Sequence, residues 1–90
     1  MKILVVIGHQ NPEQTSFCHA IVGTAVEELS DAGHEVVYHD LYEEGFDPVL
    51  PHGEVPRDAD VPPDVARHCE EVRSAEGYLV VHPNWWGQPP

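Results

Sequence analysis

Basic residues are scarce in this sequence. Four lysine and arginine residues stand against sixteen aspartate and glutamate residues, which gives a formal net charge of −12 at pH 7. Nucleic-acid binding depends on lysine and arginine side chains that displace the counterions of phosphates, and anionic membrane surfaces attract the same side chains. We therefore expect that neither nucleic acid nor an anionic membrane surface is a partner of this acidic chain.

Cysteine and long apolar runs are scarce as well. Cys18 and Cys69 are too few for a disulfide framework or a four-cysteine zinc site, and we expect both to be buried, as free cysteines usually are. No apolar run approaches the roughly 18–20 residues that cross a bilayer, and no signal-peptide cleavage pattern follows the short apolar run after Met1. We expect a cytoplasmic protein without membrane insertion.

Recognisable metal motifs are also lacking, although the sequence contains seven histidines. No pair has the His-Glu-x-x-His spacing, and no set of cysteine and histidine matches a zinc module. We therefore predict surface and loop histidines and no metal site. The histidines are His9, His19, His34, His39, His52, His68 and His82.

Three apolar runs predict β-strands. Residues Lys2 to Ile7 form a continuous, largely β-branched run, which is typical of a strand buried on both faces of a parallel sheet. Residues 34–39 and 78–82 predict a second and a third strand.

Helical periodicity separates these strands. Thr15 or Ser16 can cap a helix that Gly33 ends, and a second helix is predicted from Asp64 to Glu76, ended by Gly77. The apolar face of the first helix is predicted to consist of Phe17, Ile21, Ala25 and Leu29, with Val22 and Val26 beside them. The second helix is predicted to turn a narrow stripe inward, made of Val65, Cys69 and Val72.

The order β-α-β-α-β predicts a single α/β domain over residues 1–90, with a parallel sheet and helices on its faces. Ligands of such sheets bind beyond the carboxyl ends of the strands, where the strand order reverses. Two loops leave those ends, residues 8–16 and residues 82–90. We therefore expect a ligand site between these two loops.

Each loop allows more than one interpretation. The first, "GHQNPEQTSF", leads into a helix N-terminus that attracts phosphate, but it contains neither GxGxxG nor GxxxxGK[ST] and could equally be a simple helix cap. The second, "HPNWWGQPP", places two tryptophans between prolines. A flat aromatic ligand or a subunit contact would both use such a loop.

Taken together, "KILVVIGHQNPEQTSFCHAI", "GHEVVYHDLYEEGFDPVL" and "YLVVHPNWWGQPP" resemble the flavodoxin-like NAD(P)H:quinone oxidoreductases, the DT-diaphorase family, over nearly the whole chain. The resemblance implies a three-layer α/β/α fold with a five-stranded parallel sheet. It also implies that this chain is the N-terminal half of such a domain, truncated to about three strands within the ring-binding loop, so that the third strand becomes an edge.

The same resemblance implies a cofactor and a reaction. The cofactor is FAD, or FMN in some members. NAD(P)H gives a hydride to the flavin and leaves, and a quinone or similar acceptor then takes the hydride, in a two-electron ping-pong cycle. The full-length family implies a homodimer, and its catalytic tyrosine and histidine belong to a later half that has no counterpart in these residues.

The family's cofactor contacts carry over residue by residue. The positions that match the loop and helix start holding the flavin phosphates are His9, Thr15, Ser16, Phe17 and Cys18; several members have asparagine in place of Cys18. The positions that match the loop along the isoalloxazine ring are Pro83, Asn84, Trp85, Trp86 and Gly87.

Two other functions stay open. A flavodoxin-like electron carrier would suit the acidic surface, although flavodoxins favour a phosphate loop richer in serine, threonine and glycine. A non-catalytic remnant could instead bind a partner through its open sheet edge or its tryptophan loop. A reductase passes hydrides and a carrier passes single electrons, whereas the remnant would bind no flavin.

Overall fold

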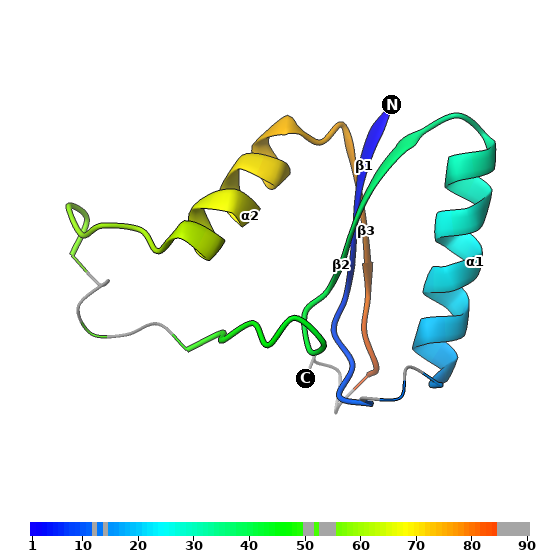
Figure 1. Ribbon diagram of the computed structural model, residues 1–90, viewed down its shortest axis with the longest axis horizontal. Helices are drawn as coiled ribbons and strands as arrows, with labels where there is room; N and C mark the ends of the chain where they lie inside the picture. The colour runs from blue at the N-terminus through cyan, green and yellow to red at the C-terminus, as the bar shows by residue number, and fades with distance from the viewer. Residues whose placement is uncertain (12, 14, 50–51, 53–55, 85–90) are drawn as a thin grey trace.

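The computed structural model describes residues 1–11, 13, 15–49, 52 and 56–84. The elements are β1 (Lys2–Ile7), α1 (Phe17–Asp31), β2 (Glu35–Asp40), α2 (Pro63–Ser74) and β3 (Gly77–Val81). The three strands are parallel and lie in the order β2-β1-β3, with α1 and α2 on opposite faces of the sheet (Figure 1). The predicted α/β architecture, with a sheet between two helical layers, is therefore confirmed.

Strand β1 is the centre of the fold because both of its edges are paired. Its apolar run is continuous because each of its faces is covered, as expected for a central parallel strand. Ile3, Val5 and Ile7 face α1 and form the core together with Val22, while Leu4 is buried on the other face. In the part of the chain that the structure describes, β3 has no strand on its outer side, as the resemblance implied.

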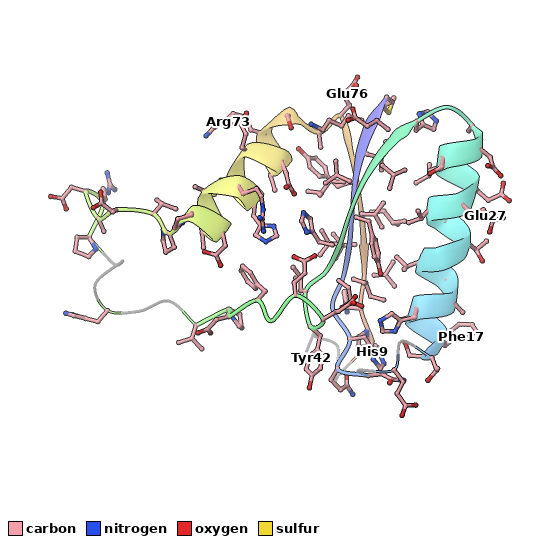
Figure 2. All side chains as sticks on the ribbon, in the orientation of Figure 1. His9, Phe17, Glu27, Tyr42, Arg73 and Glu76 are labelled. Atoms are coloured by element: carbon pink, nitrogen blue, oxygen red, sulfur yellow. The ribbon has the colours of Figure 1, made fainter. Side chains whose placement is uncertain are left out.

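Helix α1 begins and ends where the sequence predicts, but its buried face was predicted only in part: Val22, Val26 and Leu29 pack on the sheet as expected, whereas others of the predicted face do not. The hydroxyl of Ser16 caps the first turn, and Gly33 leaves the helix with φ 89°. Phe17, predicted to be inward, is 81% exposed, and it points away from the sheet, as Glu27 does (Figure 2). Apolar side chains cover a broad arc of α1, and only part of that arc packs against the sheet. These inward residues are Cys18, Val22, Val26 and Leu29.

Helix α2 packs only lightly on the sheet, and the predicted inward stripe is wrong. None of the residues of α2 is buried; Cys69 is exposed and the side chain of Val72 is 49% exposed. On the sheet face toward α2, Tyr78 and Val80 are exposed too. The expectation that both cysteines are buried also fails, since Cys18 is only half-buried.

Gly77 has a different role from the predicted one. Helix α2 already ends at Ser74, and Gly77 opens β3, where it pairs with Ile3. A Cβ atom at this position would lie 2.8 Å from Cδ1 of Ile3, so a larger residue here would have to displace the end of that side chain. Among the described residues, no helix is long and apolar enough to cross a membrane.

Candidate functional site

The three strands end side by side, and their loops meet at one end of the sheet. The backbone N–H of Gly8 donates to the carbonyl of Val81 at 3.0 Å, and that of Leu41 donates to the carbonyl of Ile7 at 3.1 Å. His9 and Tyr42 consequently lie at the same end of the molecule (Figure 2). This is the end at which open parallel sheets bind ligands.

Asn11 holds the first loop together through three hydrogen bonds. No role was predicted for this residue from the sequence. Its backbone N–H donates to Nδ1 of His9 at 3.0 Å, its amide donates to the hydroxyl of Thr15 at 3.0 Å, and its Oδ1 accepts from the N–H of Glu13 at 2.9 Å. Because Nδ1 of a neutral His9 accepts, Nε2 carries the proton and can donate to a ligand. The last of these bonds forms an Asx turn, and asparagine in a loop is the sequence signal for it.

The start of α1 has the properties of an anion site. The N–H groups of Phe17 and Cys18 have no acceptor within the helix, and no acidic side chain lies in the first turn. The phenyl ring of Phe17 is turned to solvent and Cys18 packs against the core. These two residues can therefore offer their main-chain N–H groups to a phosphate, rather than their side chains.

A buried chain of hydrogen bonds fixes Ser16, and sequence reasoning missed two of its members. Nε2 of His19 lies 2.9 Å from Oδ2 of Asp40, and Nδ1 of His19 lies 2.6 Å from the hydroxyl oxygen of Ser16. A carboxylate can only accept, so Nε2 of His19 donates to Asp40. In the neutral ring Nδ1 then accepts from the Ser16 hydroxyl, which itself accepts from the His19 backbone N–H at 3.1 Å.

This arrangement connects the start of α1 to β2. The Ser16 hydroxyl is fully used inside the protein, which leaves the main-chain N–H groups and His9 as the donors directed outward. Sequence signals existed for both missed residues: His19 stands three positions after the capping serine, and Asp40 ends the strand beside β1.

A largely apolar cavity of about 440 Å³ adjoins the first loop. Its walls come from the loops after β1 and β2, and sequence reasoning gave the second of these no part in the site. Aromatic residues just beyond the end of β2 were the available signal. The lining residues are Gly8, His9, Gln10, Leu41, Tyr42, Phe46 and Pro48.

The second predicted loop is described only at its beginning. Pro83 is half-buried and Asn84 is exposed. Trp85, Trp86 and Gly87 lie outside the described residues. The ring-binding role of residues 83–87 therefore stays a prediction.

Two titratable groups near the end of β2 are perturbed. Burial, followed by the charges of nearby carboxylates led by Asp40, raises the pKa of Tyr38 above 10.0. Burial alone would lower the pKa of His39, but hydrogen bonds to Glu71 and Glu44 outweigh it and raise that pKa above 6.5. The expectation of surface histidines is wrong here, because His19 and His39 are buried.

A family model described as "Flavodoxin-like fold" matches residues 1–90, the whole sequence. The chain belongs to this flavodoxin-like family. It is 30% identical over 88 residues to an uncharacterised NAD(P)H oxidoreductase of Haemophilus influenzae, with 96% of this chain and 43% of that protein covered. It is 27% identical over 104 residues to NAD(P)H dehydrogenase [quinone] 1 of Rattus norvegicus, with 94% and 37% covered.

Among solved structures, an NAD(P)H:quinone oxidoreductase from Methanothermobacter marburgensis superposes with a TM-score of 0.86 at 26% identity. The match covers all of this chain and 47% of that one. The flavodoxin-like chain thus spans less than half the length of the relatives it matches.

Proposed function

We propose that this chain is the flavin-binding part of an NAD(P)H-dependent oxidoreductase that reduces quinones or similar acceptors. The observation that carries the proposal is the N-terminus of α1. It is a helix start without acidic side chains in its first turn, at the ligand-binding end of the sheet, beside a loop that Asn11 holds in place. The names of the relatives, NAD(P)H oxidoreductase and NAD(P)H dehydrogenase [quinone], support the same reaction class.

The residues of this chain fit a phosphate-bearing cofactor, FAD or alternatively FMN. The N–H groups of Phe17 and Cys18 and the Nε2–H of His9 supply donors for phosphate. Residues 83–87 would lie along the ring. A bound flavin would supply the hydride chemistry between NAD(P)H and the acceptor. The chain's own contribution is to hold and orient the cofactor, while a quinone is the expected acceptor and a homodimer the expected assembly of the longer relatives.

The phosphate contact can be tested with a single substitution, Ser16→Asp. Aspartate caps a helix as well as serine does, but its charge repels a phosphate at the same place. We expect FMN to bind the purified chain with quenching of flavin fluorescence, and Ser16→Asp to weaken FMN at least 10-fold while it leaves riboflavin, which has no phosphate, unchanged. The matched control is Thr24→Asp, an equal charge change at an exposed position on the same helix.

Two results would contradict this proposal. If Ser16→Asp binds FMN as tightly as Thr24→Asp does, α1 is not the phosphate site, and if neither FAD nor FMN binds, these residues do not form a flavin site by themselves. If flavin binds, anaerobic addition of NADH followed by a quinone tests the redox cycle: the flavin absorption band should bleach and then return.

A further inference from the structure

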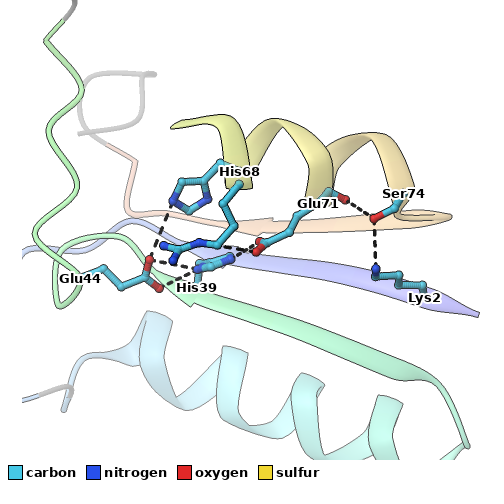
Figure 3. Close-up of polar contacts among 7 residues, drawn as sticks. Lys2, His39, Glu44, His68, Glu71 and Ser74 are labelled. Atoms are coloured by element: carbon cyan, nitrogen blue, oxygen red, sulfur yellow. Dashed lines mark hydrogen bonds and ion pairs between the residues drawn. The ribbon is translucent and has the colours of Figure 1, made fainter. Parts of the chain in front are cut away.

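A second cluster of side chains lies on the other face of the sheet, away from the proposed flavin site. Successive residues of a strand point to opposite faces, so Asp40 faces α1 whereas His39 faces α2. His39 on β2, Glu44 in the following turn and His68 on α2 bring one nitrogen or oxygen atom each to within 4.8 Å of one another. Figure 3 shows the three side chains converging from three separate segments.

The turn after β2 explains why Glu44 reaches back to the strand. The backbone N–H of Glu44 donates to the carbonyl of Asp40 at 3.0 Å, and that of Phe46 donates to the carbonyl of Leu41 at 3.0 Å. Gly45 allows this reversal with φ 69°, in the left-handed region that glycine adopts without strain. The carboxylate of Glu44 consequently lies 2.8 Å from Nδ1 of His39 and 4.0 Å from Nε2 of His68.

We propose that His39, Glu44 and His68 bind a divalent transition-metal ion, with Zn²⁺ as the ion that the donors suit. Two imidazole nitrogens and one carboxylate form a common protein donor set for zinc. Three such atoms bound to one ion lie about 3.3 Å apart in tetrahedral geometry, and the separations of 2.8 and 4.0 Å in the cluster lie on either side of that value.

Glu71 supplies the outer contact that such a site needs. Its carboxylate accepts from Nε2 of His39, which leaves Nδ1 of that ring as the nitrogen directed at Glu44. Metal-binding histidines usually have their second nitrogen held in this way by a carboxylate, which fixes the orientation and the tautomer of the ring. Glu71 therefore fixes the ring of His39 with Nδ1 toward Glu44, and a metal ion would replace the proton that Nδ1 donates to Glu44 in this structure.

The surroundings leave room for an ion and carry the right sign of charge. The three residues line a cavity of about 340 Å³, which Asp64 and Arg67 also line. A water molecule could occupy a fourth position. The carboxylates of Glu44, Glu71 and Asp64 outnumber the guanidinium of Arg67, so the cavity favours a cation.

An ion at this site would join α2 to the rest of the fold. None of the residues of α2 is buried, and His68 would provide a metal bond from this helix to β2 and to the turn after it. The proposed role is therefore to hold α2 in place, and it does not depend on flavin binding or on redox activity.

The test is a Zn²⁺ titration of the chelator-treated, desalted chain against a chromophoric indicator. We expect one equivalent to bind, and Co²⁺ at the same site to give the visible absorption of a tetrahedral complex. His68→Ala should weaken Zn²⁺ at least 10-fold, and Glu71→Gln, which alters only the outer contact, by about 10–100-fold.

Two controls separate this site from adventitious metal binding. His52→Ala removes an exposed histidine elsewhere, and Cys69→Ser removes the exposed thiol next to His68; both should bind Zn²⁺ as the parent chain does. Equal affinity in His68→Ala and the parent, loss of binding in Cys69→Ser, or no Zn²⁺ binding at micromolar concentration would overturn the proposal and leave only an ion-pair cluster.

A measurement without mutation guards against a variant that fails to fold. Zn²⁺ should protect His68 of the parent chain from diethyl pyrocarbonate, as mapped by mass spectrometry, while the exposed His52 stays reactive. Equal modification of His68 with and without Zn²⁺ would exclude the site.

Discussion

Asp40→Asn should destabilise this protein far more than a carboxylate-to-amide change usually does. Oδ2 of Asp40 accepts from Nε2 of His19 and Oδ1 accepts from the N–H of Glu43 at 3.2 Å. Only 3% of the Asp40 side chain and 5% of the His19 side chain are exposed. An asparagine can accept at one of these positions only, and its amide would turn N–H groups toward the other donor.

The size of the effect follows from the burial of the pair. A hydrogen bond to a charged group contributes about 1.5–3 kcal/mol, and a buried donor without an acceptor costs a similar amount. We expect the free energy of unfolding to fall by about 2–3 kcal/mol, which corresponds to a loss of roughly 8–24 °C in Tm for a domain of this size. A chain of this length has roughly 5–14 kcal/mol in total, so the loss is a large share.

Urea unfolding followed by far-ultraviolet circular dichroism measures this change, with Asp60→Asn as the matched control. Asp60 is exposed, so the same substitution and the same charge change should alter stability by less than about 0.5 kcal/mol. Combining Asp40→Asn with His19→Ala should show a coupling energy of about 1 kcal/mol or more. A difference below about 0.5 kcal/mol between Asp40→Asn and Asp60→Asn would refute the reasoning.

Three further predictions concern stability. Val22→Ala should cost about 2–3 kcal/mol, because the side chain is 3% exposed in the core, whereas the same change at the half-exposed Val72 should cost less than about 0.5 kcal/mol by urea unfolding. Ser16→Ala removes the cap of α1 and should lower the free energy of unfolding by about 0.5–2 kcal/mol. Its control, Ser30→Ala at the exposed end of the helix, should change that free energy little. With chelator present, protonated His39 should stabilise the fold fully below pH 6.5, its ordinary pKa; this stabilisation is lost as the pH rises through the raised pKa of the folded state. The difference in Tm between the chain and His39→Gln should therefore shrink above pH 6.5, and a constant difference would contradict the assignment.

Local patterns predicted the elements of this fold because each signal lies within the element itself. The apolar run of β1, the cap at Ser16 and the glycine at position 33 all act within a few residues. The inward face of α1 could not be predicted in the same way, since apolar residues cover a broad arc and the packing against β1 decides which of them turn inward. Gly77 was misread for a related reason, because its close neighbour Ile3 is distant in sequence.

The site was predictable in part. The resemblance pointed to the start of α1 and its loop, where the main-chain N–H groups of the first turn have no acceptor within the helix. Asn11 was overlooked although its turn is local. The pairs His19 with Asp40 and His39 with His68 were overlooked because the register of β1 with β2 and the placement of α2 bring them together. The spacing of residues in the sequence does not predict contacts of this kind.

The register of the sheet also has a consequence for how this chain folds. Strands β1 and β2 pair directly and are connected by α1. These three elements are adjacent in the sequence and can therefore assemble with one another first. Strand β3 joins β1 only after the chain has closed on itself, as the bond from the N–H of Lys2 to the carboxylate of Glu76, 74 residues away, illustrates. Contacts between residues far apart in the sequence form slowly. Contacts that form after the rate-limiting step of folding affect mainly the unfolding rate. We therefore expect β3, the strand that leads into the second loop, to dock last, so that substitutions in it speed unfolding more than they slow folding.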